Sequence, residues 1–422
     1  TPLDKQITKL VAYYLQEQHL SQHKLDDEIS KRFLDMYLKT LDPMKVYFLQ
    51  SDIDAFEKQR LLLDDQIQKG DIQFAYDVFR TFLKRIDERV VWAEQFVEAN
   101  HDFTVDEEIA RAPDAARYAT NEAEARELWR KRIKLDLLRY RVDDEGMTAE
   151  KQKEKVRRRY VSFAKRMHQT DRDELLEMYL SALTMSFDPH TTYMSPNSYT
   201  NFEIQMRLEL DGIGAELRSI DGYTVVNKII PEGAADKEGS LKAEDRIIGV
   251  GQGADGEIED VVDMKLREVV DRIRGKAGTI VRLEVTDTDG LNRRIVNIQR
   301  DKIELKDSEA QKAIFEHGTK PSGEPFKIGV INLPSFYLDM DGARRGDPDF
   351  RSTTRDVRKI LEEFNKQGVD AVILDLRRNG GGSLQEAINL TGLFIEGGPV
   401  VQVKGPDGYV QAYEDNDTSI LW

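Results

Sequence analysis

The spacing of apolar residues changes at about residue 205, and this change constrains the fold more than any other feature. Before it, apolar residues recur every three or four positions, as in Ile7, Leu10, Val11, Tyr14 and Leu15, which indicates helices with one apolar face. After it, short β-branched runs alternate with Gly, Pro and Asp turns. We therefore predict a multidomain α+β chain.

The helical pattern predicts an N-terminal domain over residues 1–203, whose last part, about 186–203, leads into the core. Helical spacing continues in Phe33, Tyr37 and Leu41. Asn121 followed by Glu124 is typical of a capped helix start. The segment 102–119 is acidic, then alanine-rich, and is predicted to be irregular.

Residues 204–305 are predicted to form a compact, mostly β module. Its elements are strands near 223–230, 246–250, 279–285 and 294–298 and a helix near 264–274. Residues 306–422 then alternate strand and helix, with strands at 327–333 and 371–376 and helices at 354–366 and 384–394. This order favours a parallel sheet with right-handed crossovers, as in the first part of an α/β core.

Composition excludes several classes of function. The 62 basic and 78 acidic residues give a formal charge of −16, which argues against a nucleic-acid or membrane-surface binder. The absence of cysteine excludes disulfides, thiol catalysis and thiolate metal sites, and is compatible with an oxidising compartment. His19 and His23 can share a helix face but lack an acidic partner at a metal-site spacing, so we predict no metal and name no cofactor.

A first glycine loop, Asp211-Gly-Ile-Gly-Ala-Glu-Leu217, opens the β module. Glycines there allow successive backbone N–H groups to hold a carboxylate, and the strand that follows offers an edge to a peptide. A simple hairpin turn is the alternative that this loop alone leaves open.

A second glycine turn, Asp375-Leu-Arg-Arg-Asn-Gly-Gly-Gly-Ser383, ends an apolar run. Ser383 is a nucleophile or a helix cap; the pattern Ser383-Leu-Gln-Glu386 and the absence of GxSxG favour a capping box. Ser335 is assigned to a turn or cap. Glycines before a helix start suit a phosphate or an oxyanion, but no nucleotide-binding pattern is present.

Further stretches carry a family resemblance. Segments 225–230, 231–235, 244–250 and 266–273 resemble a PDZ domain of bacterial proteases, except that Glu244 replaces a common glycine and so predicts a different turn. Asp188-Pro-His-Thr-Thr-Tyr193, Gly329–Tyr337 and Asp375–Gly382 complete the pattern. The chain thus resembles, over nearly its whole length, the carboxy-terminal processing protease family, specifically its tail-specific branch.

This resemblance implies a serine endopeptidase of the bacterial periplasm or cell envelope that binds protein or peptide substrates with apolar C-termini and cleaves with a Ser–Lys dyad. An envelope adaptor protein is a further implied partner. In the family, the dyad lies beyond the position matching Trp422, so this chain is expected to bind tails without cleaving them.

The resemblance also implies the site residues. Those implied to dock the tail are Gly212, Ile213, Gly214 and Ala215, with Leu217 lining an apolar pocket. Those implied to form the oxyanion hole are Gly381 first, with Gly380 and Gly382 shaping the turn. A non-enzymatic PDZ scaffold or adaptor is the main alternative, and an α/β enzyme that binds phosphate at the glycine turn is a weaker one.

Overall fold

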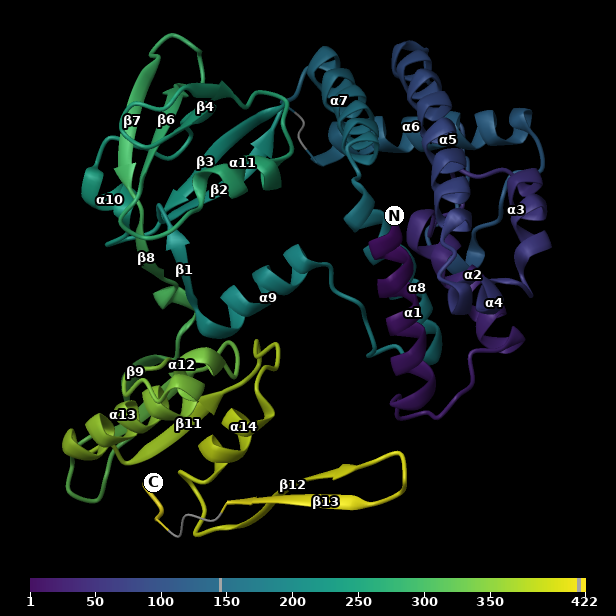
Figure 1. Cartoon of the computed structure of the whole chain (residues 1–422). Helices are drawn as coiled ribbons and strands as arrows, with labels where there is room; N and C mark the ends of the chain where they lie inside the picture. The colour runs from purple at the N-terminus through teal and green to yellow at the C-terminus, as the bar shows by residue number, and fades with distance from the viewer. Residues whose placement is uncertain (144–145, 416–418) are drawn as a thin grey trace. The chain divides into compact units, whose positions relative to one another are not determined.

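The structure is a computed structural model that describes residues 1–143, 146–415 and 419–422 (Figure 1). The chain separates into two compact units, Thr1–Pro196 and Asn197–Trp422. The predicted multidomain α+β class is confirmed, because the first unit is helical and the second carries the sheets. The boundaries proposed at 203 and 305 stay predictions.

Helices form the first unit, as the apolar period predicts. They are α1 Pro2–Glu17, α2 Asp27–Leu41, α3 Gln50–Phe56, η1 Glu57–Gln59, α4 Leu63–Lys69, α5 Gln73–Glu98, η2 Pro113–Ala115, α6 Glu122–Asp143, α7 Ala149–His168 and α8 Arg172–Phe187. Within 102–119 the structure shows one short 3₁₀ turn, η2, so the irregular segment is confirmed. No described helix is long and apolar enough to cross a bilayer.

The core of this unit confirms one predicted stripe and corrects another. Phe33 and Tyr37 are fully buried in α2. In α1, Leu15 is buried and Ile7 and Val11 pack against the core, but Leu10 and Tyr14 are 52% and 49% exposed, so the predicted stripe is wrong at these two residues. Thr8 and Ala12, which the stripe did not include, are buried in their place and are small enough to allow a close approach.

The helix α9, Pro196–Arg207, starts at the last residue of the first unit and continues into the second, and the sequence did not predict it. A β module follows, and its elements are β1 Glu209–Gly212, β2 Ala215–Ile220, β3 Tyr223–Ile229, α10 Ala234–Glu238, β4 Arg246–Gln252, β5 Ile258–Asp260, α11 Leu266–Ile273, β6 Ile280–Thr286, β7 Arg294–Gln299 and β8 Asp301–Glu304. The main sheet has the order β2-β3-β4-β6-β7, β5 pairs with β4, and β1 pairs with β8. The predicted strands and helix of this module are confirmed.

The turn at Glu244 has a left-handed backbone. Glu244 has a φ of +69°, a conformation that a glycine adopts more easily than a glutamate, and the predicted difference from the turn of PDZ domains stays a prediction. Its side chain accepts a hydrogen bond from Arg218 at 2.6 Å at the surface.

The rest of the second unit is an α/β layer. Its elements are η3 Lys306–Ser308, β9 Gln311–His317, β10 Phe326–Asn332, α12 Met340–Arg345, α13 Thr353–Lys366, β11 Ala371–Asp375, α14 Leu384–Thr391, β12 Gly398–Lys404 and β13 Val410–Asp415. β10 and β11 are parallel, with α13 between them in sequence, as predicted. The antiparallel edge strand β9 and the β12–β13 hairpin were not predicted.

Candidate functional site

The first glycine loop turns its carbonyl groups inward. The Ile213 carbonyl accepts a hydrogen bond from Ala235 N–H at 2.7 Å, and the Gly214 carbonyl accepts one from Ile230 N–H at 2.9 Å. Gly214 has a φ of +75°, and a Cβ placed on it would lie 3.1 Å from Gly233 Cα. A glycine is therefore required here by both conformation and space.

The N–H groups of the same loop are left without partners. Ile213 and Gly214 donate to no residue that the structure describes. Because Ile230 N–H bonds the Gly214 carbonyl, Ala215 and Ile229 form a non-hydrogen-bonded pair, and the Ala215 backbone groups face away from β3. Three successive N–H groups thus remain for an anion, which is the arrangement of a nest.

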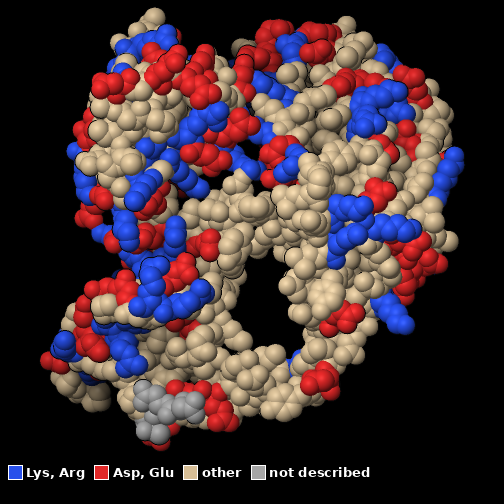
Figure 2. Space-filling view, viewed as in Figure 1, with Lys and Arg blue, Asp and Glu red and all other residues tan. Residues whose placement is uncertain are grey.

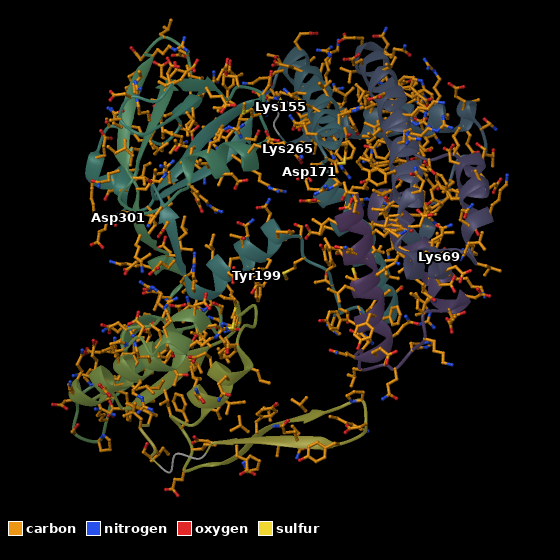
Figure 3. The ribbon with its side chains drawn as sticks, in the orientation of Figure 1. Lys69, Lys155, Asp171, Tyr199, Lys265 and Asp301 are labelled. Carbon is orange, nitrogen blue, oxygen red and sulfur yellow. The ribbon has the colours of Figure 1, made fainter. Side chains whose placement is uncertain are left out.

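An open strand edge continues from this loop. β2 is the outermost strand of its sheet among the described residues. α11 packs beside β2 and buries Val269 and Ile273 in the core of the module. Lys265, labelled in Figure 3, directly precedes α11. Ala215 and Leu217 are half-buried against that core. The edge is therefore accessible to an extended chain and has an apolar inner face.

A buried arginine holds the C-terminal end of α11. Arg300 is 4% exposed and donates to the carbonyls of Ile273 at 2.8 Å and Arg272 at 3.1 Å. It also donates to Gln252 Oε1 at 2.7 Å. These bonds satisfy carbonyl groups that a helix end otherwise leaves unpaired, and so fix α11 against the sheet.

The second glycine turn, between β11 and α14, has the opposite arrangement. The N–H groups of Gly380, Gly381 and Ser383 donate to Pro334 O at 3.0 Å, Asn379 Oδ1 at 2.8 Å and Phe336 O at 2.8 Å, respectively. Within Gly380–Ser383, the Gly382 N–H alone lacks a partner among the described residues.

The conformations of these glycines also differ. Gly381 and Gly382 have φ values of +97° and +141°. A Cβ on Gly382 would lie 2.3 Å from Phe336 O, whereas one on Gly380 or Gly381 meets no atom within 4 Å. The turn is therefore tight at Gly382 and exposed to solvent at Gly381.

Ser383 caps α14, as predicted, by accepting a hydrogen bond from Glu386 N–H at 3.3 Å. The second half of the predicted capping box is wrong. The Glu386 carboxylate, 3% exposed, accepts instead from Ser352 Oγ at 2.8 Å and Thr354 N–H at 2.7 Å. Tertiary packing places better donors at Glu386 than its own helix end does.

The electrostatics near this turn are dominated by an exposed ion pair. Arg377 contacts Asp375 at 2.6 Å, and this hydrogen-bonded pairing lowers the pKa of Asp375 to about 2. Ser335 and Ser383 have no lysine amino group as a hydrogen-bond partner within the described ranges. In the first unit, Asp188 Oδ1 accepts from His190 N–H at 2.7 Å, which is a local turn.

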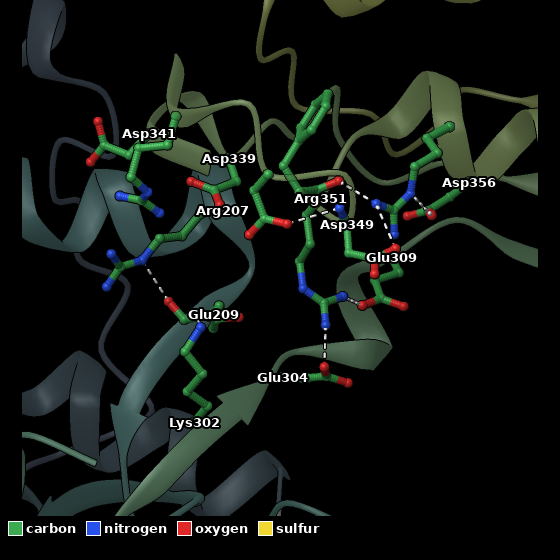
Figure 4. Close-up of a pocket in the computed structure, with 14 residues that line it drawn as sticks. Arg207, Glu209, Lys302, Glu304, Glu309, Asp339, Asp341, Asp349, Arg351 and Asp356 are labelled. Carbon is green, nitrogen blue, oxygen red and sulfur yellow. Dashed lines mark hydrogen bonds and ion pairs between the residues drawn. The ribbon is translucent and has the colours of Figure 1, made fainter. Parts of the chain in front are cut away.

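A cavity of about 540 Å³ that the sequence analysis did not predict lies beside β1, β8 and α12 (Figure 4). Arg351 bridges Glu304, at 2.7 Å, and Glu309, while Arg355 donates to Phe350 O at 2.8 Å. The lining of the cavity carries more carboxylates than basic side chains. Among the described residues, no group of three His, Asp or Glu side chains is arranged to hold a metal. On the face of the molecule that Figure 2 shows, basic and acidic residues are interspersed.

Three family models match the chain in succession. The tail-specific protease N-terminal domain matches residues 11–197, the PDZ domain 201–286, and peptidase family S41 327–421. The PDZ match includes the loop Gly212–Ala215, and the S41 match includes the turn Gly380–Gly382.

Similar proteins carry related names. A tail-specific protease of Haemophilus influenzae is 37% identical over 413 residues, which cover 98% of this chain and 56% of that protein. A carboxyl-terminal-processing protease of Picosynechococcus is 28% identical over 60% of this chain and 54% of that protein. The chain therefore spans just over half the length of these relatives.

Two solved structures are also similar. The PDZ domain of a carboxy-terminal protease from Vibrio cholerae, in complex with peptide, is 40% identical, covers 23% of this chain and 100% of that one, and has a TM-score of 0.23. The photosystem II D1 C-terminal processing protease is 22% identical, covers 68% of this chain and 71% of that one, and has a TM-score of 0.28. With three successive family models and 37% identity along 98% of its length, the chain is similar to the tail-specific branch of the carboxy-terminal processing proteases.

Proposed function

We propose that the protein is a tail-specific serine endopeptidase that captures apolar C-termini of protein substrates at the loop Gly212–Ala215. The observation that carries this proposal is the run of unpaired N–H groups at Ile213, Gly214 and Ala215, at the head of an open strand edge. A C-terminal carboxylate would accept from these groups, and the tail would pair with β2. Leu217, half-buried beneath that edge, would contact the apolar side chains of the tail.

We propose further that the turn Gly380–Gly382 contributes to an oxyanion hole. Such a hole needs N–H donors aimed at the position where negative charge develops. The Gly382 N–H is unpaired, but the Gly381 N–H is donated to Asn379. Gly381, which the family resemblance favours as the oxyanion-hole residue, would therefore donate its N–H to an oxyanion only after the hydrogen bond to Asn379 breaks.

Cleavage by a Ser–Lys dyad is also a proposal. Since neither Ser335 nor Ser383 is hydrogen-bonded to a lysine in the described chain, we expect residues 1–422 to bind tails without hydrolysing them. An envelope location and an adaptor protein remain parts of the same proposal.

Tail capture is tested by fluorescence anisotropy with a labelled, unstructured peptide that ends in apolar residues. Residues 1–422 should bind the free acid about tenfold to a hundredfold more tightly than the C-terminal amide, because charge-assisted hydrogen bonds are lost in the amide. Equal affinity for both peptides would refute capture by the loop. Release of fragments from the same peptide, monitored by mass spectrometry, would refute the expected lack of cleavage.

The scaffold alternative makes the same binding prediction. The scaffold alternative also predicts that no longer form of the chain hydrolyses peptides. Peptidase assays of longer forms therefore distinguish the two functions.

A further inference from the structure

The backbone of β2 defines which residues can pair with a tail. Val226 N–H bonds Asp245 O at 2.9 Å, and Val226 O accepts from Glu244 N–H at 2.8 Å, so the Val226 backbone faces β4. Leu217 lies opposite Val226 in the β2–β3 ladder. The N–H and C=O groups of Leu217 must therefore face the open edge, as those of Ala215 do.

These positions set the register of a bound tail. With the carboxylate at Ile213 and Gly214, the N–H of the last tail residue reaches the Ala215 carbonyl. The residue two positions before it then exchanges both backbone hydrogen bonds with Leu217. In an antiparallel ladder, the penultimate residue consequently lies opposite Glu216, and the fourth from the end lies opposite Arg218.

Both of these pairs are of the close, non-hydrogen-bonded type, with Cα atoms about 4.5 Å apart. Glu216 and Arg218 are exposed on the side of β2 away from the core. Side chains of the penultimate and fourth-from-last tail residues would point to that same side, since directly opposed residues share a face.

The neighbours of the two side chains leave opposite local charges. Glu216 accepts from the neutral Asn227 at 3.1 Å, while Lys228, its cross-strand neighbour, contacts Asp307 at 2.7 Å. The surroundings of Glu216 are thus net negative.

Around Arg218 the balance is positive. Arg218 pairs with one carboxylate, Glu244, at 2.6 Å. A second arginine, Arg246, lies next to Val225, the cross-strand neighbour of Arg218, and 4.9 Å from the Tyr223 ring centroid. Two positive charges therefore face one negative charge here.

We propose that Glu216 and Arg218 determine a charge preference in the tail, with a basic penultimate residue and an acidic fourth-from-last residue bound best. This inference rests on the proposed capture of the C-terminus. The last residue of the tail would be selected for an apolar side chain. The penultimate and fourth-from-last residues, whose side chains face solvent, would be selected for their charge.

The test uses two labelled peptides of identical composition, with the same apolar last residue. One has Lys penultimate and Glu fourth from the end, and the other has these two residues exchanged. Residues 1–422 should bind the first about tenfold more tightly at low salt, because two favourable cross-strand pairs become unfavourable. The ratio should shrink as ionic strength rises, since the pairs are exposed.

The double variant Glu216→Lys with Arg218→Glu should invert the preference. Its matched control, Glu284→Lys with Arg293→Glu, exchanges an ion pair of the β6–β7 end and should keep the original ratio. Equal binding of both peptides, with the amide form still weak, would overturn this inference and leave tail capture standing. Equal binding of acid and amide forms would instead refute the proposed function itself.

Discussion

The two glycine turns of the second unit use the same residue type for opposite purposes. At Ile213 and Gly214, the carbonyls are hydrogen-bonded inward and the N–H groups have no partner among the described residues. In Gly380–Ser383, three N–H groups are hydrogen-bonded and only that of Gly382 is open. Glycine content alone therefore does not define an anion site; the partners of the surrounding backbone do.

The packing of the two turns differs in the same way. Gly214 is held between Gly233 and Ile303, so its backbone is fixed before any ligand binds. Gly381 has open space around it and is held by a single side-chain hydrogen bond. In the proposed function, the first turn would bind a ligand without rearranging, which lowers the entropy cost of capture, whereas the second would first have to release the Gly381 N–H from Asn379.

The largest expected effect comes from removing a buried charged side chain, Arg300 in the β module or Glu386 in the α/β layer. Arg300→Ala should cost about 3–4 kcal/mol of the β module's stability, because buried carbonyls at the end of α11 lose their donors. Hydrogen exchange should rise in α11 and β2 but not in α14. Glu386→Ala, which removes the acceptor of Ser352 and Thr354, should show the reverse pattern. Effects that spread equally over both regions would contradict this separation.

A matched pair of glycine substitutions sharpens the comparison. Gly214→Ala should cost about 2–3 kcal/mol and weaken tail binding, because the new Cβ strikes backbone and the conformation is left-handed. Gly381→Ala should cost only about 1 kcal/mol, from conformation alone, and leave tail affinity unchanged. Hydrogen exchange and peptide anisotropy on both variants provide the measurement. Similar losses of affinity in the two would show that Gly214 has no special role.

Asn379→Ala should release the Gly381 N–H at a cost of about 1 kcal/mol, because it removes the bonds to Gly381 and Leu333. Amide exchange at Gly381, followed by NMR, should accelerate, while exchange at Gly214 stays as in the parent. An unchanged rate at Gly381 would mean that other atoms protect this amide.

The smallest expected effect is an increase in the stability of the β module. Glu244→Gly should stabilise the β module by about 0.5–1 kcal/mol, because glycine adopts a φ of +69° without strain and the ion pair lost to Arg218 is exposed. Urea titration monitored by hydrogen exchange of β3 and β4 measures it. A loss of stability would indicate that the Arg218–Glu244 pair outweighs the backbone strain.

Much of the fold could be predicted from local pattern. The helices of the first unit, the strands of the β module and the parallel β10–β11 pair follow from apolar spacing and turn residues. Prediction failed where packing rather than pattern decides. Leu10 and Tyr14 continue a helical stripe yet are exposed. In α9 only Ile204 and Met206 are buried, so its apolar pattern is too weak to predict a helix.

The candidate sites divide along the same line. Sequence located both glycine turns and the Ser383 cap, because capping and left-handed conformations depend on residue type within a few positions. It could not show that Glu386 turns to Ser352, that Asn379 occupies the Gly381 N–H, or that Leu217 faces an open edge. Those depend on atoms brought together from distant parts of the chain.

The sequence by itself thus determined the order of domains, the family resemblance and the places where glycine must permit unusual backbone. Only the tertiary structure decided which N–H groups are free to bind, because each backbone group takes the best partner that folding places within reach.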